Sequence, residues 1–186
     1  MAKCNYFDKL EELSALSAEA VELACGGGDT DRLSALRKNG DRLVCELEDT
    51  LFSDFLPPLE RDGIAACAHD LSRVMDRAIE LSAAGGAPAY RGRPNGEGEI
   101  CCRLAKELAL AVSLLRRIRK PDEMPDLRGF RSLLSEGRAA HETMMAGVRA
   151  GAVSRSAVQA VFLTGRLRTC LGECFESLVE VMLKNI

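Results

Sequence analysis

The hydrophobic positions of this chain recur at steps of three and four residues over most of its length, which is the period of an amphipathic α-helix. The clearest such stripe belongs to a helix expected to begin after Asp29 or Thr30 as N-cap, and consists of Leu33, Leu36, Gly40, Leu43, Leu47, Leu51 and Phe55. No window alternates with period two for long enough to predict a strand. The pattern therefore predicts an all-α protein.

Breaks in this pattern divide the chain into six helices. Gly26–Gly28 is a strong stop for the first helix. Pro57 and Pro58 separate the second from the third, because a proline lacks the backbone donor that a helix interior needs. We expect helices over about 6–25, 30–55 and 60–81, and then over about 99–119, 126–150 and 155–184.

A segment rich in Gly and Pro, residues 85–98, lies between the third and fourth helices. We expect it to join two pseudo-repeated halves, residues 1–84 and 99–186, within a single helical domain. The repeat rests on helix count and length, because the two halves do not match residue by residue. Short loops within each half favour antiparallel neighbours and an elongated bundle.

Composition narrows the classes of function. The chain has 186 residues, a formal net charge of −3 and no Trp. It has no basic field or interleaved aromatic residues for nucleic acid, so we expect no nucleic-acid partner. Its most apolar stretch, 104–118, carries Lys106, Glu107, Arg116 and Arg117, and the first residues lack the apolar core of a signal peptide. We expect a cytoplasmic protein that does not insert into a membrane.

The eight cysteines are many for this length, but they do not indicate a disulfide framework. Most lie within or beside helical apolar stripes, where a free thiol behaves as a small hydrophobic group. Two pairs leave another interpretation open, in which the thiols bind a metal or sense redox conditions: Cys101 with Cys102, and Cys170 with Cys174.

Four carboxylates on the second and third helices are the candidate metal ligands: Asp41, Asp62, Asp70 and Asp76. Paired helices that each offer an inward carboxylate build oxygen-rich metal sites in bundles. The competing interpretation is that they form ion pairs with arginines three or four residues away, namely Arg37, Arg42, Arg73 and Arg77. His69 and His141 fit no metal motif and are expected at the surface or its boundary. No catalytic residue is predicted.

One segment resembles a known family. The residues from Phe55 through Pro57 and Pro58 to Ile64, FLPPLERDGI, form a proline corner followed by the start of a helix. This corner is similar to that of PhoU-like phosphate-transport regulators, in particular the divergent branch associated with inorganic-phosphate transporters. The resemblance implies a PhoU-like six-helix fold and metal sites built from carboxylate pairs four residues apart on the longer helices.

The matching pairs here depart from that pattern. They are Arg37 with Asp41, Ser72 with Asp76, Glu136 with Ala140, and Gly165 with Thr169. A metal cluster needs several carboxylates to balance its charge. We therefore predict a weakened or absent site, with Asp41 and Asp76 as its remnants, Asp62 and Asp70 nearby, and a divalent metal or iron as the candidate ion.

These observations lead to three hypotheses. The first is a non-enzymatic PhoU-like regulator or accessory protein of phosphate transport, which acts through contacts with a protein partner such as a membrane phosphate transporter and forms a homo-oligomer. The second is a cysteine-based metal-binding or redox-sensing protein. The third is a helical scaffold or dimerisation module unrelated to phosphate.

Overall fold

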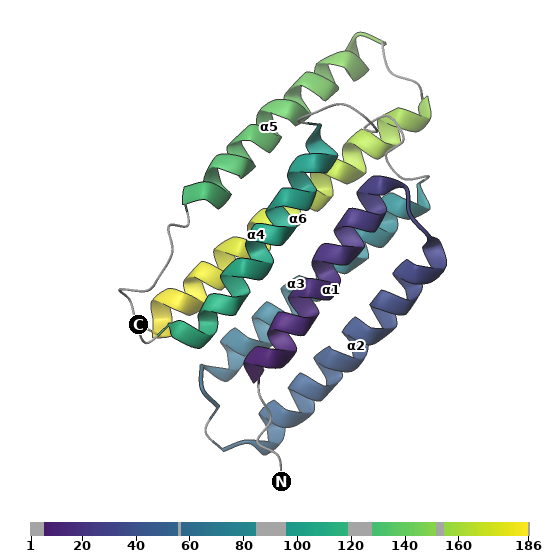
Figure 1. Ribbon diagram of the computed structural model, residues 1–186. Coiled ribbons are helices and arrows are strands. Elements are labelled where there is room, and N and C mark those ends of the chain that lie inside the picture. Colours follow the sequence, from purple (N-terminus) through teal and green to yellow (C-terminus); the bar gives the residue numbers. More distant parts are fainter. Residues whose placement is uncertain (1–5, 56, 85–95, 119–127, 152–154, 186) are drawn as a thin grey trace.

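The protein is an antiparallel bundle of α-helices (Figure 1). The computed structural model describes residues 6–55, 57–84, 96–118, 128–151 and 155–185. Over these ranges it contains no strand, so the all-α prediction is confirmed. Its six α-helices are α1 (Tyr6–Gly26), α2 (Thr30–Ser53), α3 (Arg61–Ala83), α4 (Glu97–Leu114), α5 (Arg128–Arg149) and α6 (Arg155–Asn185). A short 3₁₀ turn, η2 (Leu115–Arg117), extends α4.

Local chemistry accounts for the turn between α1 and α2. Gly27 adopts a φ of 70°, a left-handed conformation that glycine reaches without a Cβ penalty. Gly28 then donates its N–H to the carbonyl of Leu23 at 2.7 Å and closes the end of α1. Asp29 caps α2 by accepting from the N–H of Asp31 at 2.8 Å. Of the two expected caps, the structure therefore has Asp29.

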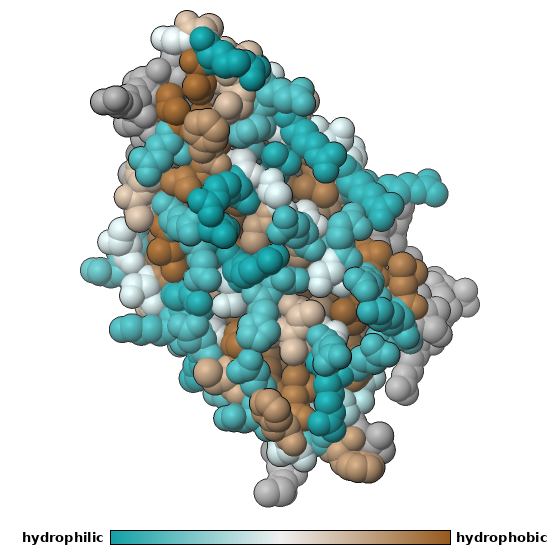
Figure 2. Space-filling model, turned by 180° about the vertical axis from the view of Figure 1, so that it is seen from behind, coloured by the Kyte–Doolittle hydropathy of each residue, from teal (hydrophilic) through white to brown (hydrophobic). Residues whose placement is uncertain are grey.

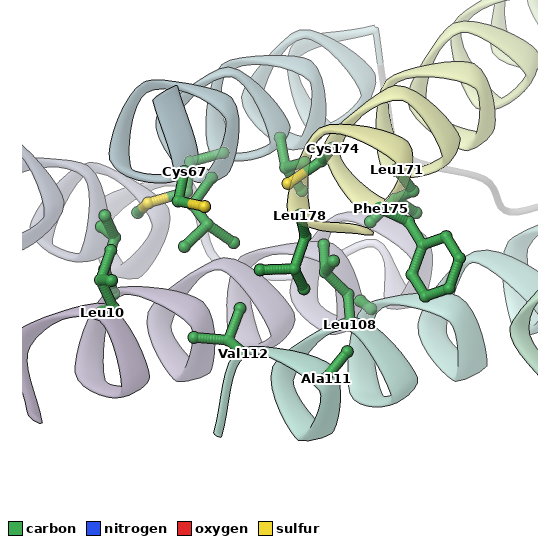
Figure 3. Close-up of a cluster of buried hydrophobic side chains, with 14 of the residues drawn as sticks. Leu10, Cys67, Leu108, Ala111, Val112, Leu171, Cys174, Phe175 and Leu178 are labelled. Atoms are coloured by element: carbon green, nitrogen blue, oxygen red, sulfur yellow. The ribbon is translucent and has the colours of Figure 1, made fainter. Parts of the chain in front are cut away.

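The helices share one hydrophobic core. α1, α3, α4 and α6 pack against one another in the middle of the bundle, while α2 covers one edge and α5 the other (Figure 1). Figure 3 shows how the core joins the two halves, because Cys67 of α3 lies beside Cys174 and Leu178 of α6, above Val112 of α4. On the α5 side, the rings of Phe130 and Phe175 stack with centroids 3.8 Å apart.

The proline corner differs in one respect from the sequence-based expectation. The apolar stripe of the second helix was expected to include Phe55, but α2 ends at Ser53 and the side chain of Phe55 is 87% exposed. The stripe pattern is wrong there because a residue beyond the last helical turn no longer points along the buried face. Leu59, four residues further on, is the side chain that fills the core beneath the corner.

The boundaries of the central break are only partly visible. Residues 85–95 lie outside the described ranges, while α4 begins at Glu97, two residues before the expected start. That early start matters, because Glu97 and Gly98 are buried at the beginning of the helix. None of the helices in the described part of the chain is long and apolar enough to cross a membrane.

Candidate functional site

The structure brings two of the predicted metal ligands together. Arg37 of α2 lies between Asp41, one turn further along the same helix, and Asp76 of α3. Its Nε donates to Oδ1 of Asp76 at 2.7 Å, and its Nη1 contacts Oδ1 of Asp41. Both carboxylates are at least half exposed. A guanidinium therefore occupies the space between the two carboxylates, where a metal ion would otherwise balance their charge.

The other two predicted ligands lie elsewhere. Asp62 is exposed in the first turn of α3, near the C-terminal end of α6, and Asp70 is half-buried and pairs with Arg73 at 3.2 Å. Within the described residues, no group of three or more His, Cys, Asp or Glu side chains is arranged to hold a metal ion. The contacts of Asp41, Asp70 and Asp76 thus follow the ion-pair interpretation, with Arg37 and Arg73 as partners.

The cysteines fall into three groups. All of those described are free thiols, and Cys4 lies outside the described residues. Burial raises the thiol pKa of Cys101 and Cys174 well above the usual value, and that of Cys67 to about 12. Cys45 is exposed on α2.

The third group is a pair of thiols from different helices. Cys25, near the end of α1, and Cys102 of α4 are half-buried, and their thiols lie close enough for each to influence the other. This contact raises the pKa of the Cys25 thiol and lowers that of Cys102. Neither pair suggested by the sequence is this one, because Cys25 and Cys102 lie on different helices, far apart in the chain.

A second charged group lies inside the bundle, and the sequence did not indicate it. Glu97, in the first turn of α4, has no exposed side-chain surface. Arg168 of α6 donates Nε to its Oε1 at 3.1 Å, and Nδ1 of His141 on α5 lies 2.9 Å from Oε2. Both carboxylate oxygens are therefore partnered, as a buried carboxylate requires. We refer to these three residues as the Glu97 network.

Two glycines make room for this network. A Cβ atom on Gly165 of α6 would lie 2.5 Å from Cε1 of His141, and one on Gly137 of α5 would lie 2.6 Å from Cδ of Arg168. A side chain at either position would therefore displace the imidazole or the guanidinium from its present place beside Glu97. The sequence assigned Gly165 to a carboxylate position of the PhoU-like pattern, whereas here it accommodates a histidine.

His141 and Arg168 of this network line a cavity of about 360 Å³ between α3, α5 and α6, whereas Glu97 does not reach it. Four arginines and one histidine line it, against a single carboxylate. The residues that line it are Arg73, Arg77, His141, Phe162, Gly165, Arg166, Arg168, Thr169, Cys170 and Glu173. We call this space the arginine cavity. α3 and α6 lie behind α1 and α4 in Figure 1, and hydrophilic residues cover much of the rear face in Figure 2.

Each arginine of the cavity already touches a carboxylate. Arg77 and Arg166 share Glu80, at 2.6 and 3.7 Å, and Arg73 contacts Glu173 at 3.3 Å in addition to Asp70. Among the described residues, these contacts use a single nitrogen of each guanidinium. A guanidinium has five N–H donors. Asp70, Glu80, Glu97 and Glu173 balance the charge of the four arginines, and the cavity offers a ligand the N–H donors that these contacts leave over.

Sequence reasoning missed the arginine cavity because nothing local distinguishes its members. Glu97 falls in the segment rich in Gly and Pro that was expected to precede the fourth helix, and His141 was expected at the surface or its boundary. The pairing of residues 97, 141 and 168 depends on how α4, α5 and α6 pack. The only local signal is the glycine at positions 137 and 165, since a glycine inside a long helix often marks a close approach.

Comparison with known proteins adds no family to these observations. A scan against protein-family models finds no match, and a search of curated proteins finds no relative. The similarity of the proline corner to PhoU-like proteins therefore stays a prediction.

Proposed function

We propose that the protein binds a small oxyanion of the phosphate class in the arginine cavity and acts as a non-enzymatic regulatory protein. The observation that carries this proposal is the cavity lining itself, in which four guanidinium groups and an imidazole face one space with a single carboxylate, that of Glu173. Planar guanidinium groups match the oxygen geometry of phosphate and carboxylate ligands and can bind two oxygens at once.

The buried position of Glu97 supports the proposal. The carboxylate of Glu97 contacts Arg168 and His141 on the side away from the cavity, so that both side chains are oriented before a ligand binds. A preorganised site loses less conformational entropy on binding than one whose long side chains must first be ordered. Thr169, also in the lining, donates its hydroxyl to the carbonyl of Gly165 at 2.9 Å, so its oxygen remains as an acceptor.

The regulatory part of the proposal rests on the resemblance at the proline corner. PhoU-like proteins regulate phosphate transport through protein contacts, and an oxyanion cavity provides such a regulator with a signal to detect. The ligand would bridge α3, α5 and α6, which bear the arginines and the histidine. Binding would therefore favour one packing of these helices and alter the surface that a transporter or a second copy contacts in the cytoplasm.

The proposal can be tested by titrating the protein with inorganic phosphate in an isothermal titration calorimeter. We expect saturable binding to the natural protein and a loss of affinity of about tenfold or more in Arg73→Gln with Arg166→Gln, because each lost charged hydrogen bond weakens binding by about 1.5–3 kcal/mol. Both residues are at least half exposed, so the fold should tolerate their replacement.

Arg42→Gln provides the matched control. Arg42 is as exposed as Arg73 and also contacts carboxylates, but it lies on α2, which contributes no residue to the arginine cavity. Its replacement should leave phosphate binding unchanged. Equal binding by the double variant and the natural protein would contradict the proposal, as would equal losses in the double variant and in Arg42→Gln.

The contact between Cys25 and Cys102 supports a second candidate function, thiol-based redox sensing. A peroxide would oxidise the two thiols to a disulfide and would itself be reduced to water and an alcohol, or to two waters. Thiol titration of peroxide-treated protein tests this candidate. We expect two fewer free thiols in the natural protein and no paired loss in Cys25→Ser. Loss of thiols elsewhere, with this pair intact, would contradict it.

A further inference from the structure

The end of the bundle at the proline corner exposes two large aromatic side chains. Phe52, in the last turn of α2, is 88% exposed, and Phe55, just after the helix, is 87% exposed. The structure buries the aromatic rings of Phe130 and Phe175 completely or nearly so. Phe162 of α6 is exposed as well, at 49%, but Phe52 and Phe55 lie only three positions apart and are the most exposed large apolar side chains among the described residues. Their apolar surface gains free energy only if something covers it.

The backbone that holds these two rings is fixed in place. The guanidinium of Arg61 donates to the carbonyls of Leu51 at 3.0 Å and of Phe55 at 3.2 Å, and also contacts that of Asp54. On the other side, the hydroxyl of Tyr6 donates to Oδ2 of Asp54 at 3.1 Å. The backbone that carries the two rings is thus held by hydrogen bonds from two other helices, which lowers the entropy lost when a partner binds there.

The surroundings of the rings are acidic. Residues 48–62 contain five carboxylates and one basic residue, Arg61. Arg61 directs its donors to backbone carbonyls of the corner, while Glu48 contacts His69 and Asp54 accepts from Tyr6. Lys184, at the end of α6, lies near Glu60 and Asp62, so the carboxylates outnumber the cations here without being free of them. The acidic residues of this segment are Glu48, Asp49, Asp54, Glu60 and Asp62. The surface is therefore a pair of aromatic rings with a negatively charged rim.

We infer that this surface, Phe52 and Phe55 with the carboxylates of Asp49, Glu60 and Asp62, is a docking site for a cationic amphipathic segment of another protein. Arginine and lysine bind favourably over the face of an exposed aromatic ring, and the same cations pair with the carboxylate rim. Apolar side chains of the segment cover the remaining ring surface, as in the aromatic centre and polar rim of known interfaces.

The charge of the rim argues against two other occupants. A second copy docking through the same surface would bring two sets of carboxylates together, which disfavours a symmetric contact. The headgroups of anionic lipids would meet the same repulsion at a membrane surface. The docking site lies at the start of α3, whereas Arg73 and Arg77 place the arginine cavity about three to four turns further along that helix. The inference therefore does not rest on the anion-binding proposal.

The test uses the full chain and a fluorescein-labelled 14-residue peptide of alternating Arg-Leu and Lys-Leu pairs. Binding is followed by fluorescence anisotropy, with the same peptide carrying Glu at every Arg and Lys as the charge-reversed probe. We expect saturable binding of the cationic peptide, which weakens as salt is raised, and no binding of the acidic peptide. Equal binding of both peptides would overturn the inference.

Three variants locate the binding site. Phe52→Ser with Phe55→Ser should weaken binding at least about tenfold, as expected for central aromatic contacts. Asp49→Asn with Glu60→Gln should weaken it less and flatten its salt dependence. Leu110→Ser is the matched control, because Leu110 is a similarly apolar side chain, 61% exposed on α4, and its replacement should leave binding unchanged.

Three outcomes would overturn the inference. The first is undiminished peptide binding by the Phe52→Ser, Phe55→Ser variant, which would place the contact elsewhere on the protein. Mass measurement by light scattering would reveal a second copy as the occupant if the natural protein self-associates and the Phe52→Ser, Phe55→Ser variant does not. Co-sedimentation with vesicles of phosphatidylserine and phosphatidylcholine that depends on the two phenylalanines would identify a membrane instead. Because these residues are exposed, circular dichroism should show the variants to be folded with unchanged Tm.

Discussion

Two groups of ionised side chains hold neighbouring helices together in this protein, in opposite surroundings. In the first, Arg37 links Asp41 and Asp76 across α2 and α3, with both carboxylates at least half exposed. In the second, Arg168 and His141 hold Glu97, whose side chain has no exposed surface. The chemistry is similar in both, since each joins a guanidinium to carboxylate oxygens. The comparison teaches that burial, more than residue type, decides what such a contact contributes.

Water explains the difference. Around Arg37 the solvent competes for every hydrogen bond and screens the charges, so the group contributes little stability. The side chain of Glu97 has no exposed surface, so solvent does not compete for its hydrogen bonds, and the loss of a partner leaves an unpaired charge largely removed from water. The exposed group can be altered with little effect on the fold, whereas the buried group restricts how α4, α5 and α6 pack. The predictions below test this contrast.

The largest expected effect is that of Glu97→Ala. It leaves Arg168 and His141 without their partner inside the bundle, and we expect a loss of about 3 kcal/mol in the free energy of unfolding. Urea denaturation followed by circular dichroism measures it, with Asp76→Ala as the exposed counterpart. Replacement of Glu97 and Arg168 together by Met should recover part of the loss, because no unpaired charge of this ion pair remains. Equal losses for Glu97→Ala and Asp76→Ala would remove the contrast between the two groups.

Each charged group has a cysteine one helical turn further along, and these two thiols should differ in reactivity. Cys45 follows Asp41 and is exposed, while Cys101 follows Glu97 and is fully buried. Burial and the charge of Glu97 raise the pKa of Cys101, so near pH 8 it is a neutral thiol behind packed helices. We expect iodoacetamide to modify Cys45 at least about 100-fold faster, because Cys101 must wait for local opening.

Mass spectrometry of digested protein follows both sites in one sample. The same measurement on Glu97→Ala should show faster labelling of Cys101 and unchanged labelling of Cys45. Comparable rates at the two sites in the natural protein would mean that the interior near Glu97 opens as readily as the surface of α2.

A pair of glycine substitutions tests how tightly the buried group is packed. Gly165→Ala places a Cβ 2.5 Å from Cε1 of His141 and would push the imidazole away from Glu97. We expect a loss of about 1–2 kcal/mol. Gly129→Ala, where nothing lies within 4 Å, should instead stabilise the protein by up to about 1 kcal/mol through helix propensity. Thermal unfolding measures both, and a stabilising Gly165→Ala would show that His141 does not need its present position.

The exposed group should respond weakly to the loss of its arginine. Arg37→Gln removes the contacts to Asp41 and Asp76, and we expect a change below about 1 kcal/mol in the free energy of unfolding. The difference between variant and natural protein should shrink further in about 1 M NaCl, where surface charges are screened. Chemical denaturation at low and high salt provides the measurement. A loss as large as that of Glu97→Ala would show that exposure does not control these energies.

Metal should have the smallest effect on the natural protein. Because Arg37 lies between the two carboxylates, we expect Mn²⁺, Fe²⁺ or Zn²⁺ to change Tm by less than about 1 °C. Arg37→Glu with Ser72→Glu restores the paired carboxylates of the PhoU-like pattern, and metal should raise its Tm by about 5 °C or more.

Metal analysis of protein purified without chelator gives the complementary result. We expect little metal in the natural protein, and no less in Asp41→Ala with Asp76→Ala. Stoichiometric metal that disappears in the double variant would show that the two carboxylates still bind an ion, with Arg37 displaced.

The sequence allowed much of the fold to be predicted, because periodicity is a local property. The stripe of leucines in α2 is visible in the chain, and so are the stops at Gly26–Gly28 and at Pro57 and Pro58. The contact between Arg37 and Asp41 follows from their spacing of four residues. The contact of Arg37 with Asp76 does not, because it depends on the packing of α2 against α3. The exposure of Phe55 was missed because the spacing of apolar residues does not show at which residue the helix ends.

By itself, the sequence determined that the protein is helical, where most helices begin and end, and which faces turn inward. Those properties arise from hydrophobic periodicity, capping residues and prolines, which act within a few residues. Only the tertiary structure decided that Glu97 is buried, that Arg168 and His141 meet it, and that four arginines share one cavity. Such contacts join residues more than forty positions apart, and their energies depend on the water that packing excludes.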